Sequence, residues 1–206
     1  MAAPVDVANR AIVLLGAARI SDLDDDVKAA REIKAVYDVS RQVEIRKNRW
    51  GFCMKRAQLP AIAAVPPATS PNLFGFVNAY NLPADCLGVD MVGDVWLNTA
   101  NLENFRASGR AAYAIEQRQI LTDQGGPLNV RYKADITNVN IFDACFVEVF
   151  AHKLAIMTCT SITESGSKLG DLRKGYLFEL GEARKANAIE RPPELLPDNS
   201  WLASRL

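Results

Sequence analysis

Three aspartates at alternate positions are the first residues of this sequence whose spacing could bind a metal ion. Asp22, Asp24 and Asp26 match the opening of a calcium-binding loop, in which alternate carboxylates supply oxygen ligands. Such a loop also needs a glycine and a bidentate glutamate at positions that Val27 and Ile33 occupy here. The run therefore fits a solvated, acidic helix start better than a weak structural cation site, and we expect no bound metal ion.

A histidine and a glutamate four residues apart could support proton transfer. His152, the only histidine, follows Glu148 by one helical turn, so the two side chains share a helix face. General acid–base catalysis would need further partners, and no nucleophile motif accompanies the pair. The four cysteines form no CxxC pair, and no phosphate-binding glycine motif occurs. We expect a structural pair, no catalytic residue and no cofactor.

One basic cluster brackets two aromatic residues, Trp50 and Phe52. Its members are Arg46, Lys47, Arg49, Lys55 and Arg56. Cations interleaved with aromatic rings could hold DNA or a partner weakly, but the same pattern is typical of a helix C-terminus beside aromatic core anchors. Lys plus Arg equals Asp plus Glu at 24 each, which speaks against a dedicated nucleic-acid binder. The five cations are candidates for weak DNA or partner contacts.

The elements that position these residues begin with two helices in residues 1–56. Apolar residues recur at spacings of three and four from Pro4 until Gly16, where the first helix is expected to end. A longer helix follows the acidic run. Residues 57–135 begin with a stretch rich in proline and alanine, at 57–72, and continue as short apolar segments broken by glycine and proline. We expect residues 57–135 to form a β-rich insertion. The clearest hairpin predicted within this insertion joins residues 112–121 to 127–135.

Helical periodicity returns in residues 136–190. The stretch 141–158 is apolar on several sides, which predicts a central helix. A second helix, capped by Thr163, contains four glycines, which weaken it by roughly 1 kcal/mol each relative to alanine, so it should depend on neighbours within the fold or across an interface. The predicted class is α+β. N- and C-terminal helix pairs form one bundle from which the β-rich insertion projects.

Residues 191–206 are predicted to be an extended tail. It carries apolar residues that a monomer has little reason to expose, namely Leu195, Leu196, Trp201, Leu202 and Leu206. They either fold back or dock on another chain, and they are candidate partner or oligomer contacts. No stretch is expected to approach membrane-spanning length, no signal peptide is recognisable, and the expected compartment is the cytosol.

Several motifs, in order along most of the chain, resemble one protein family. They are ANRAIVLLGAARISDLDDD at 8–26, WGF at 50–52, YNLPADCL at 80–87, YKADITNVNIFDACFVEVFAHKLA at 132–155 and SWLASR at 200–205. Their order and spacing resemble those of tail tubular protein A and related head-to-tail adaptors of tailed bacteriophages. The stretch at 57–72 has no counterpart in the family pattern.

The resemblance implies a helical bundle with a β-rich insertion and a non-enzymatic role. Such a protein forms a ring, commonly of twelve subunits, between the portal and a tail or nozzle protein, and duplex DNA passes through it without being read. The expected location is the neck of the virion, after assembly in the host cytoplasm. One alternative is a virion-associated glycan hydrolase using two of Glu116, Asp123 and Glu148, which would have to converge. Another is a DNA-packaging accessory protein, whose affinity for duplex DNA would depend steeply on salt.

Overall fold

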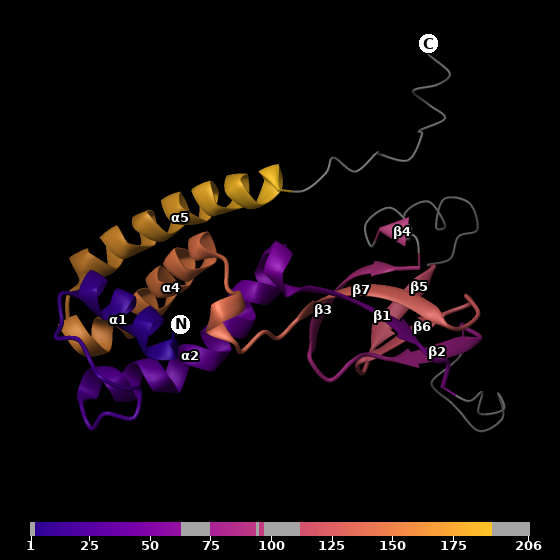
Figure 1. Cartoon of the computed structure of the whole chain (residues 1–206), viewed down its shortest axis with the longest axis horizontal. Helices are drawn as coiled ribbons and strands as arrows, with labels where there is room; N and C mark the ends of the chain where they lie inside the picture. The colour runs from indigo at the N-terminus through magenta and orange to yellow at the C-terminus, as the bar shows by residue number, and fades with distance from the viewer. Residues whose placement is uncertain (1–2, 63–74, 94, 97–111, 191–206) are drawn as a thin grey trace, which may run out of the picture.

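The chain folds into a helical part and a β part that lie side by side (Figure 1). The computed structural model describes residues 3–62, 75–93, 95–96 and 112–190. The helices are α1 (Pro4–Leu15), α2 (Lys28–Lys47), α4 (Ala144–Thr163) and α5 (Gly166–Ile189), with short 3₁₀ turns at Gly51–Cys53 and Val139–Ile141. The strands are β1 (Met54–Leu59), β2 (Asn78–Asn81), β3 (Cys86–Val92), β4 (Val95–Trp96), β5 (Tyr113–Glu116), β6 (Gln119–Thr122) and β7 (Leu128–Ala134).

Local sequence signals account for several helix ends. α1 begins at Pro4 and ends where Gly16 adopts a left-handed φ of 72°, which confirms the predicted stop. α4 starts after Asp143, whose carboxylate accepts two backbone N–H groups of the first turn. α5 is capped by Ser165 and not by Thr163 as predicted, because Thr163 belongs to the last turn of α4.

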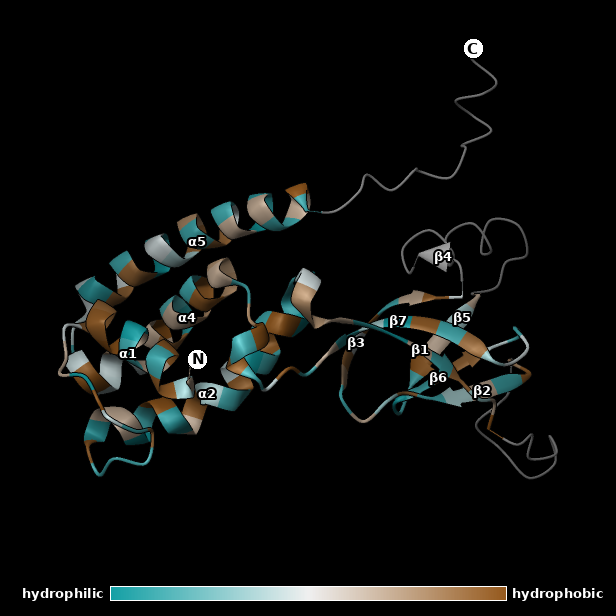
Figure 2. Cartoon of the chain, in the orientation of Figure 1, coloured by the Kyte–Doolittle hydropathy of each residue, from teal (hydrophilic) through white to brown (hydrophobic). Residues whose placement is uncertain are grey.

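α4 is the central helix, as its many apolar sides predicted. It packs against α1, α2 and α5 and buries Phe146, Phe150 and Leu154 completely. Among the described helices it alone is long and apolar enough to cross a bilayer, so the expectation that no stretch reaches that length is wrong. Three helices pack on this apolar surface, which makes α4 the core of the helical part (Figure 2).

The expected architecture, with N- and C-terminal helix pairs forming a bundle around one β-rich insertion, is wrong. α1 and α2 each pack against α4 and do not form a pair with one another. The physical reason is that both are amphipathic, and α4 is apolar on enough sides to cover both stripes as well as α5. The chain is α+β, with helices gathered around α4 and with two antiparallel sheets. Residues 191–206, the expected tail, lie outside the described residues.

The β part consists of a four-stranded sheet, in the order β1-β7-β3-β4, and a three-stranded sheet, in the order β2-β6-β5. The predicted hairpin between residues 112–121 and 127–135 is wrong. The hairpin is instead β5–β6, turned by Gln117 and Arg118, which both have positive φ. β7 pairs with β1 and β3 in the other sheet. The TDQGG stretch therefore carries the chain between sheets.

Polar contacts fasten the β part to α2. The buried Arg41 donates to the Asp135 carboxylate at 3.1 and 3.2 Å, and Gln42 donates to the same carboxylate at 2.8 Å. Lys133 on β7 donates to the backbone carbonyl of Arg46 at 2.7 Å. The expected division at residues 56 and 57 falls within β1. The helical part and the β part thus meet along the C-terminal half of α2.

Candidate functional site

The five candidate cations lie where the helical part meets the β part. Arg46 and Lys47 end α2, Arg49 follows, and Lys55 and Arg56 lie on β1. Lys55 pairs with Asp85 at 2.8 Å, Arg49 pairs with Asp90 at 2.9 Å, and Arg46 donates to the carbonyl of Leu87. Lys47 and Arg56 form no ion pair with any residue that the structure describes. The structure thus separates two cations available for an external anion from three that hold the fold together.

The aromatic residues between these cations belong to the core. Trp50 is buried, meets Phe146 edge-on at 5.2 Å between ring centroids, and donates from its indole nitrogen to the carbonyl of Glu44 at 3.1 Å. Phe52 packs against Phe142 and Phe146. Neither ring is placed to stack on a nucleic-acid base, so any DNA contact at the junction would be with phosphates.

The three carboxylates of the hydrolase alternative do not converge. Glu116 ends β5, and Asp123 follows β6, where it accepts the backbone N–H of Val77 at 3.0 Å. Glu148 lies on α4 in the helical part and forms an ion pair with Arg10 of α1. A glycan hydrolase needs two carboxyl groups at a defined separation across its substrate, and these three residues do not provide such a pair.

His152 does not pair with the Glu148 side chain as the helical spacing suggested. Its Nδ1 lies 3.0 Å from the backbone carbonyl of Glu148, and its Nε2 points toward Gly175 of α5. Burial lowers the pKa of His152, and the nearby carboxylate of Glu179 partly opposes this. The ring is a packing group between α4 and α5.

The acidic run at residues 22–26 forms a self-contained turn before α2. Asp25 accepts the backbone N–H groups of Ser21 and Asp22, at 2.7 and 3.1 Å. Asp24 pairs with Lys34, and Asp26 pairs with Arg31. The carboxylates that resembled a calcium loop are engaged by backbone groups and by cations of α2.

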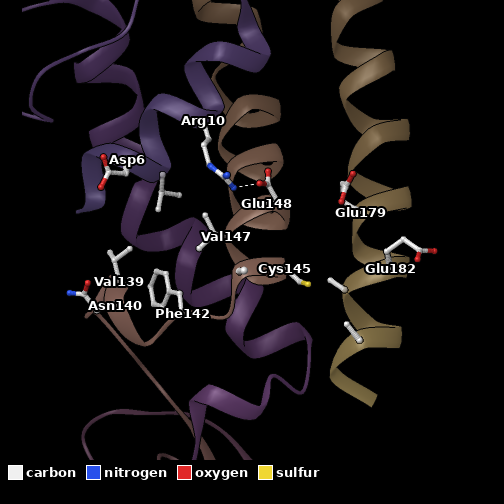
Figure 3. A pocket seen from close by; sticks show the side chains of 14 residues that line it. Asp6, Arg10, Val139, Asn140, Phe142, Cys145, Val147, Glu148, Glu179 and Glu182 are labelled. Atoms are coloured by element: carbon white, nitrogen blue, oxygen red, sulfur yellow. Dashed lines mark hydrogen bonds and ion pairs between the residues drawn. The ribbon is translucent and has the colours of Figure 1, made fainter. Parts of the chain in front are cut away.

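A groove with a volume of about 770 Å³ lies between α1, the start of α4 and α5 in the helical part (Figure 3). Val7, Phe142 and Val147 contribute apolar surface to it. Its charged side chains are four carboxylates and one guanidinium, from Asp6, Arg10, Glu148, Glu179 and Glu182. We call this hollow the α1–α4–α5 groove. Its volume lies within the roughly 300–1,000 Å³ of typical ligand sites.

Two residues of the groove carry its chemistry. Glu179 projects from α5 toward α4 and forms no ion pair with any described residue, whereas Glu182 points outward and pairs with Lys185 at 2.6 Å (Figure 3). Cys145 is half-buried, and burial together with the Asp143 carboxylate raises the pKa of its thiol. The thiol is therefore protonated at neutral pH and is not an activated nucleophile. The groove is suited to binding an apolar, cationic ligand.

Sequence reasoning missed this groove. The α5 residues that line it, Glu179, Glu182, Ala183 and Ala186, recur at spacings of three and four. That spacing indicates a shared face, but not which helix the face meets. The opposite wall comes from α1, far away in sequence, and only the three-dimensional fold brings the two together.

α5 also exposes apolar side chains on the side away from α4. Leu172, Leu180 and Ala183 are buried, whereas Leu177 and Phe178 are 67% and 66% exposed. Figure 2 shows hydrophobic residues interspersed with hydrophilic ones along this helix. A surface helix usually has one apolar side and one polar side, so this outer side of α5 suits a protein partner. The five candidate apolar residues of the tail lie outside the described residues.

No protein-family model matches the sequence, and a search of curated proteins finds no significant match.

Proposed function

We propose that this chain is a structural subunit of a bacteriophage neck, a head-to-tail adaptor. In this proposal it forms a ring with copies of itself. The ring joins the portal to a tail or nozzle protein and lets duplex DNA pass. The ordered motifs described above support this function. The architecture that the resemblance implied gives the proposal no support, because the observed architecture differs from it.

The observation that carries the proposal is the outer side of α5. Leu177 and Phe178 are large, apolar and mostly exposed, on a helix whose opposite side is already packed on α4. Closed rings need a surface on each subunit that binds a different surface on the next copy. An apolar helix side at the edge of the helical part meets the requirement for one of these two surfaces.

The neutral charge balance also suits a DNA conduit. A chain with 24 basic and 24 acidic residues neutralises few phosphates, so it would not hold a genome that must move through it. We propose no catalytic role, because Glu116 and Asp123 lie at opposite ends of the β5–β6 hairpin and Glu148 is paired with Arg10 in the helical part.

Assembly of the full chain tests the proposal. Sedimentation velocity and electron microscopy, with and without the portal protein encoded in the same genome, should show rings. Leu177→Ser should reduce assembly by roughly tenfold or more, since buried apolar anchors dominate interfaces. Val77→Ser is the control, because Val77 is 70% exposed but lies in the β part. Monomers only, with the portal present, would exclude a ring-forming adaptor.

A further inference from the structure

We infer that the α1–α4–α5 groove is the docking site for residues 200–206 of a neighbouring copy, so that each subunit of the ring is latched to the next. This inference rests on the proposed self-assembly and names the segment and the site that would hold adjacent copies together. The sequence of the segment is SWLASRL.

The groove offers two kinds of contact that the segment can use. Its apolar surface includes Phe142 and Val147, which are only partly buried, whereas Val7, which also lines it, is buried in the core. Its carboxylates outnumber its cations by four to one, and the single cation, Arg10, is engaged by Glu148. Two groove carboxylates, Asp6 and Glu179, lack an ion pair with any described residue. Asp6 accepts the backbone N–H of Ala3, whereas Glu179 projects into the space between α5 and α4 (Figure 3).

The segment carries the complementary groups. Trp201 and Leu202 are adjacent large apolar residues, and Arg205 follows as the only charged side chain of the seven. An aromatic residue in an apolar hollow with an arginine on a carboxylate at its rim is the combination that dominates binding energy at protein interfaces. Trp201 and Leu202 would occupy the apolar surface while Arg205 pairs with Glu179.

The proposed self-assembly supplies the neighbouring copy, and the length of chain after α5 sets how far the segment reaches. The groove extends along α5 from Ala186 back to Glu179, close to the end of the helix from which the chain continues. Ten residues lie between position 190 and Trp201, and the chain between these two positions can span at most about 40 Å, roughly the length of α5.

Cys145 provides a reporter inside the groove. It is half-buried, whereas Cys53, Cys86 and Cys159 are buried, so a thiol reagent should select Cys145 in the folded chain. The experiment uses the full chain with Ala203→Cys, a short bis-maleimide cross-linker and analysis by denaturing gel and mass spectrometry. We expect a ladder of covalent oligomers joined between Cys145 of one copy and position 203 of the next.

Matched substitutions assign the ladder to the groove. Trp201→Ala and Glu179→Lys should each lower the yield of cross-linked oligomer by roughly tenfold. Asp171→Lys, a carboxylate-to-lysine change at an exposed residue of α5 that does not line the groove, should leave the yield unchanged. Circular dichroism and sedimentation of each variant establish that it is folded and show its state of assembly.

The outcomes separate this inference from the proposed function. Rings that form without a Cys145–203 cross-link would overturn the latch and leave the adaptor function standing. A cross-link found only within single chains would show that the segment folds back on its own groove, which also overturns the latch. A cross-link to the portal in place of another copy would have the same effect. The absence of both rings and cross-links would remove the proposed function as well.

Discussion

Glu44 is an ionisable residue placed in the middle of the helical core. It is fully buried, and one carboxylate oxygen accepts the hydroxyl of Tyr176 at 2.9 Å. The other oxygen has no hydrogen-bond partner among the described residues. Burial and the neighbouring carboxylate raise the pKa of Tyr176, so its hydroxyl remains a donor at any physiological pH. The Tyr176–Glu44 bond is therefore the main compensation for burying this group.

Removing that donor should cost more stability than removing a comparable donor elsewhere. Tyr176→Phe should lower the free energy of unfolding by about 1–3 kcal/mol, because it leaves Glu44 without a side-chain partner. Tyr132→Phe is the matched control. Tyr132 donates to Asp85 at 3.1 Å, but Asp85 keeps its ion pair with Lys55 in the variant. Tyr132→Phe should therefore lower the free energy of unfolding by less than Tyr176→Phe. Urea titrations of both variants measure the difference, and equal losses would contradict a special role for the Glu44 contact.

His152 should make stability depend on pH near neutrality. Burial lowers its pKa in the folded state below the ordinary value of 6.5, so the unfolded chain binds the proton more readily. The stability that the neutral ring contributes is complete above pH 6.5 and is lost as the pH falls through the lowered folded pKa. Unfolding free energies between about pH 5.5 and 7.5 should therefore fall toward acid in the wild type, and less so in His152→Gln. A constant difference between the two proteins across this window would exclude the effect.

Single residues also show which part of the site could be predicted from sequence. The basic cluster was recognisable, because its cations are consecutive or nearly so. Which of these cations form ion pairs within the fold could not be predicted, because Lys55 and Arg49 pair with Asp85 and Asp90, which lie far along the chain. In the same way, helical spacing paired Glu148 with His152, whereas the fold supplies Arg10 as the partner of the Glu148 carboxylate.

At the scale of elements, α5 combines glycines that have different surroundings. A Cβ added at Gly175 would lie 3.2 Å from Nε2 of His152, whereas one added at Gly170 would meet nothing within 4 Å. Both residues lie within the helix, where alanine is preferred over glycine. The close packing of α5 on α4 at Gly175 is thus a specific requirement, and the glycine at 170 has no such role in the isolated chain.

Substitution of each of the two glycines by alanine should change the stability of the chain by different amounts. Gly170→Ala should stabilise the chain by about 0.5–1 kcal/mol through helix propensity. Gly175→Ala should stabilise the chain less than Gly170→Ala or destabilise it, because His152 must move to make room for the added Cβ. Combining Gly175→Ala with His152→Ala should restore the gain, which a double-mutant cycle in thermal unfolding would detect. Equal stabilisation by both single substitutions would show that α4 and α5 are not closely packed there.

Elements differed in how far the sequence predicted them. Helix periodicity and the end of α1 at Gly16 were readable, because these signals are local. The hairpin was misplaced, because Gln117 and Arg118 adopt positive φ without the glycine or asparagine that usually marks such a turn. The separation of β6 and β7 into different sheets depends on long-range pairing, which a periodicity of two residues does not specify.

At the scale of the whole molecule, a net charge of zero conceals an uneven distribution. Arg56 of β1 lies in register with Arg131 of β7, and Lys47 ends α2 nearby at the junction. The α1–α4–α5 groove in the helical part is acidic. A neutral chain can thus offer cations at the junction and carboxylates in the groove, as the proposed DNA conduit and its proposed assembly would require.

The junction cations predict how weakly the chain should bind DNA. Each cation that neutralises a phosphate contributes about 0.9 to the slope of log affinity against log salt concentration. Lys47→Ala and Arg56→Ala should each reduce the slope by roughly that amount, measured by fluorescence anisotropy with a short duplex. Lys55→Ala is the matched control, because Lys55 pairs with Asp85 and should release no counterion from DNA. A wild-type slope as steep as that of roughly six to ten phosphate contacts would contradict a passive conduit and favour a packaging accessory. If neither Lys47→Ala nor Arg56→Ala changed the slope, DNA would bind away from the junction.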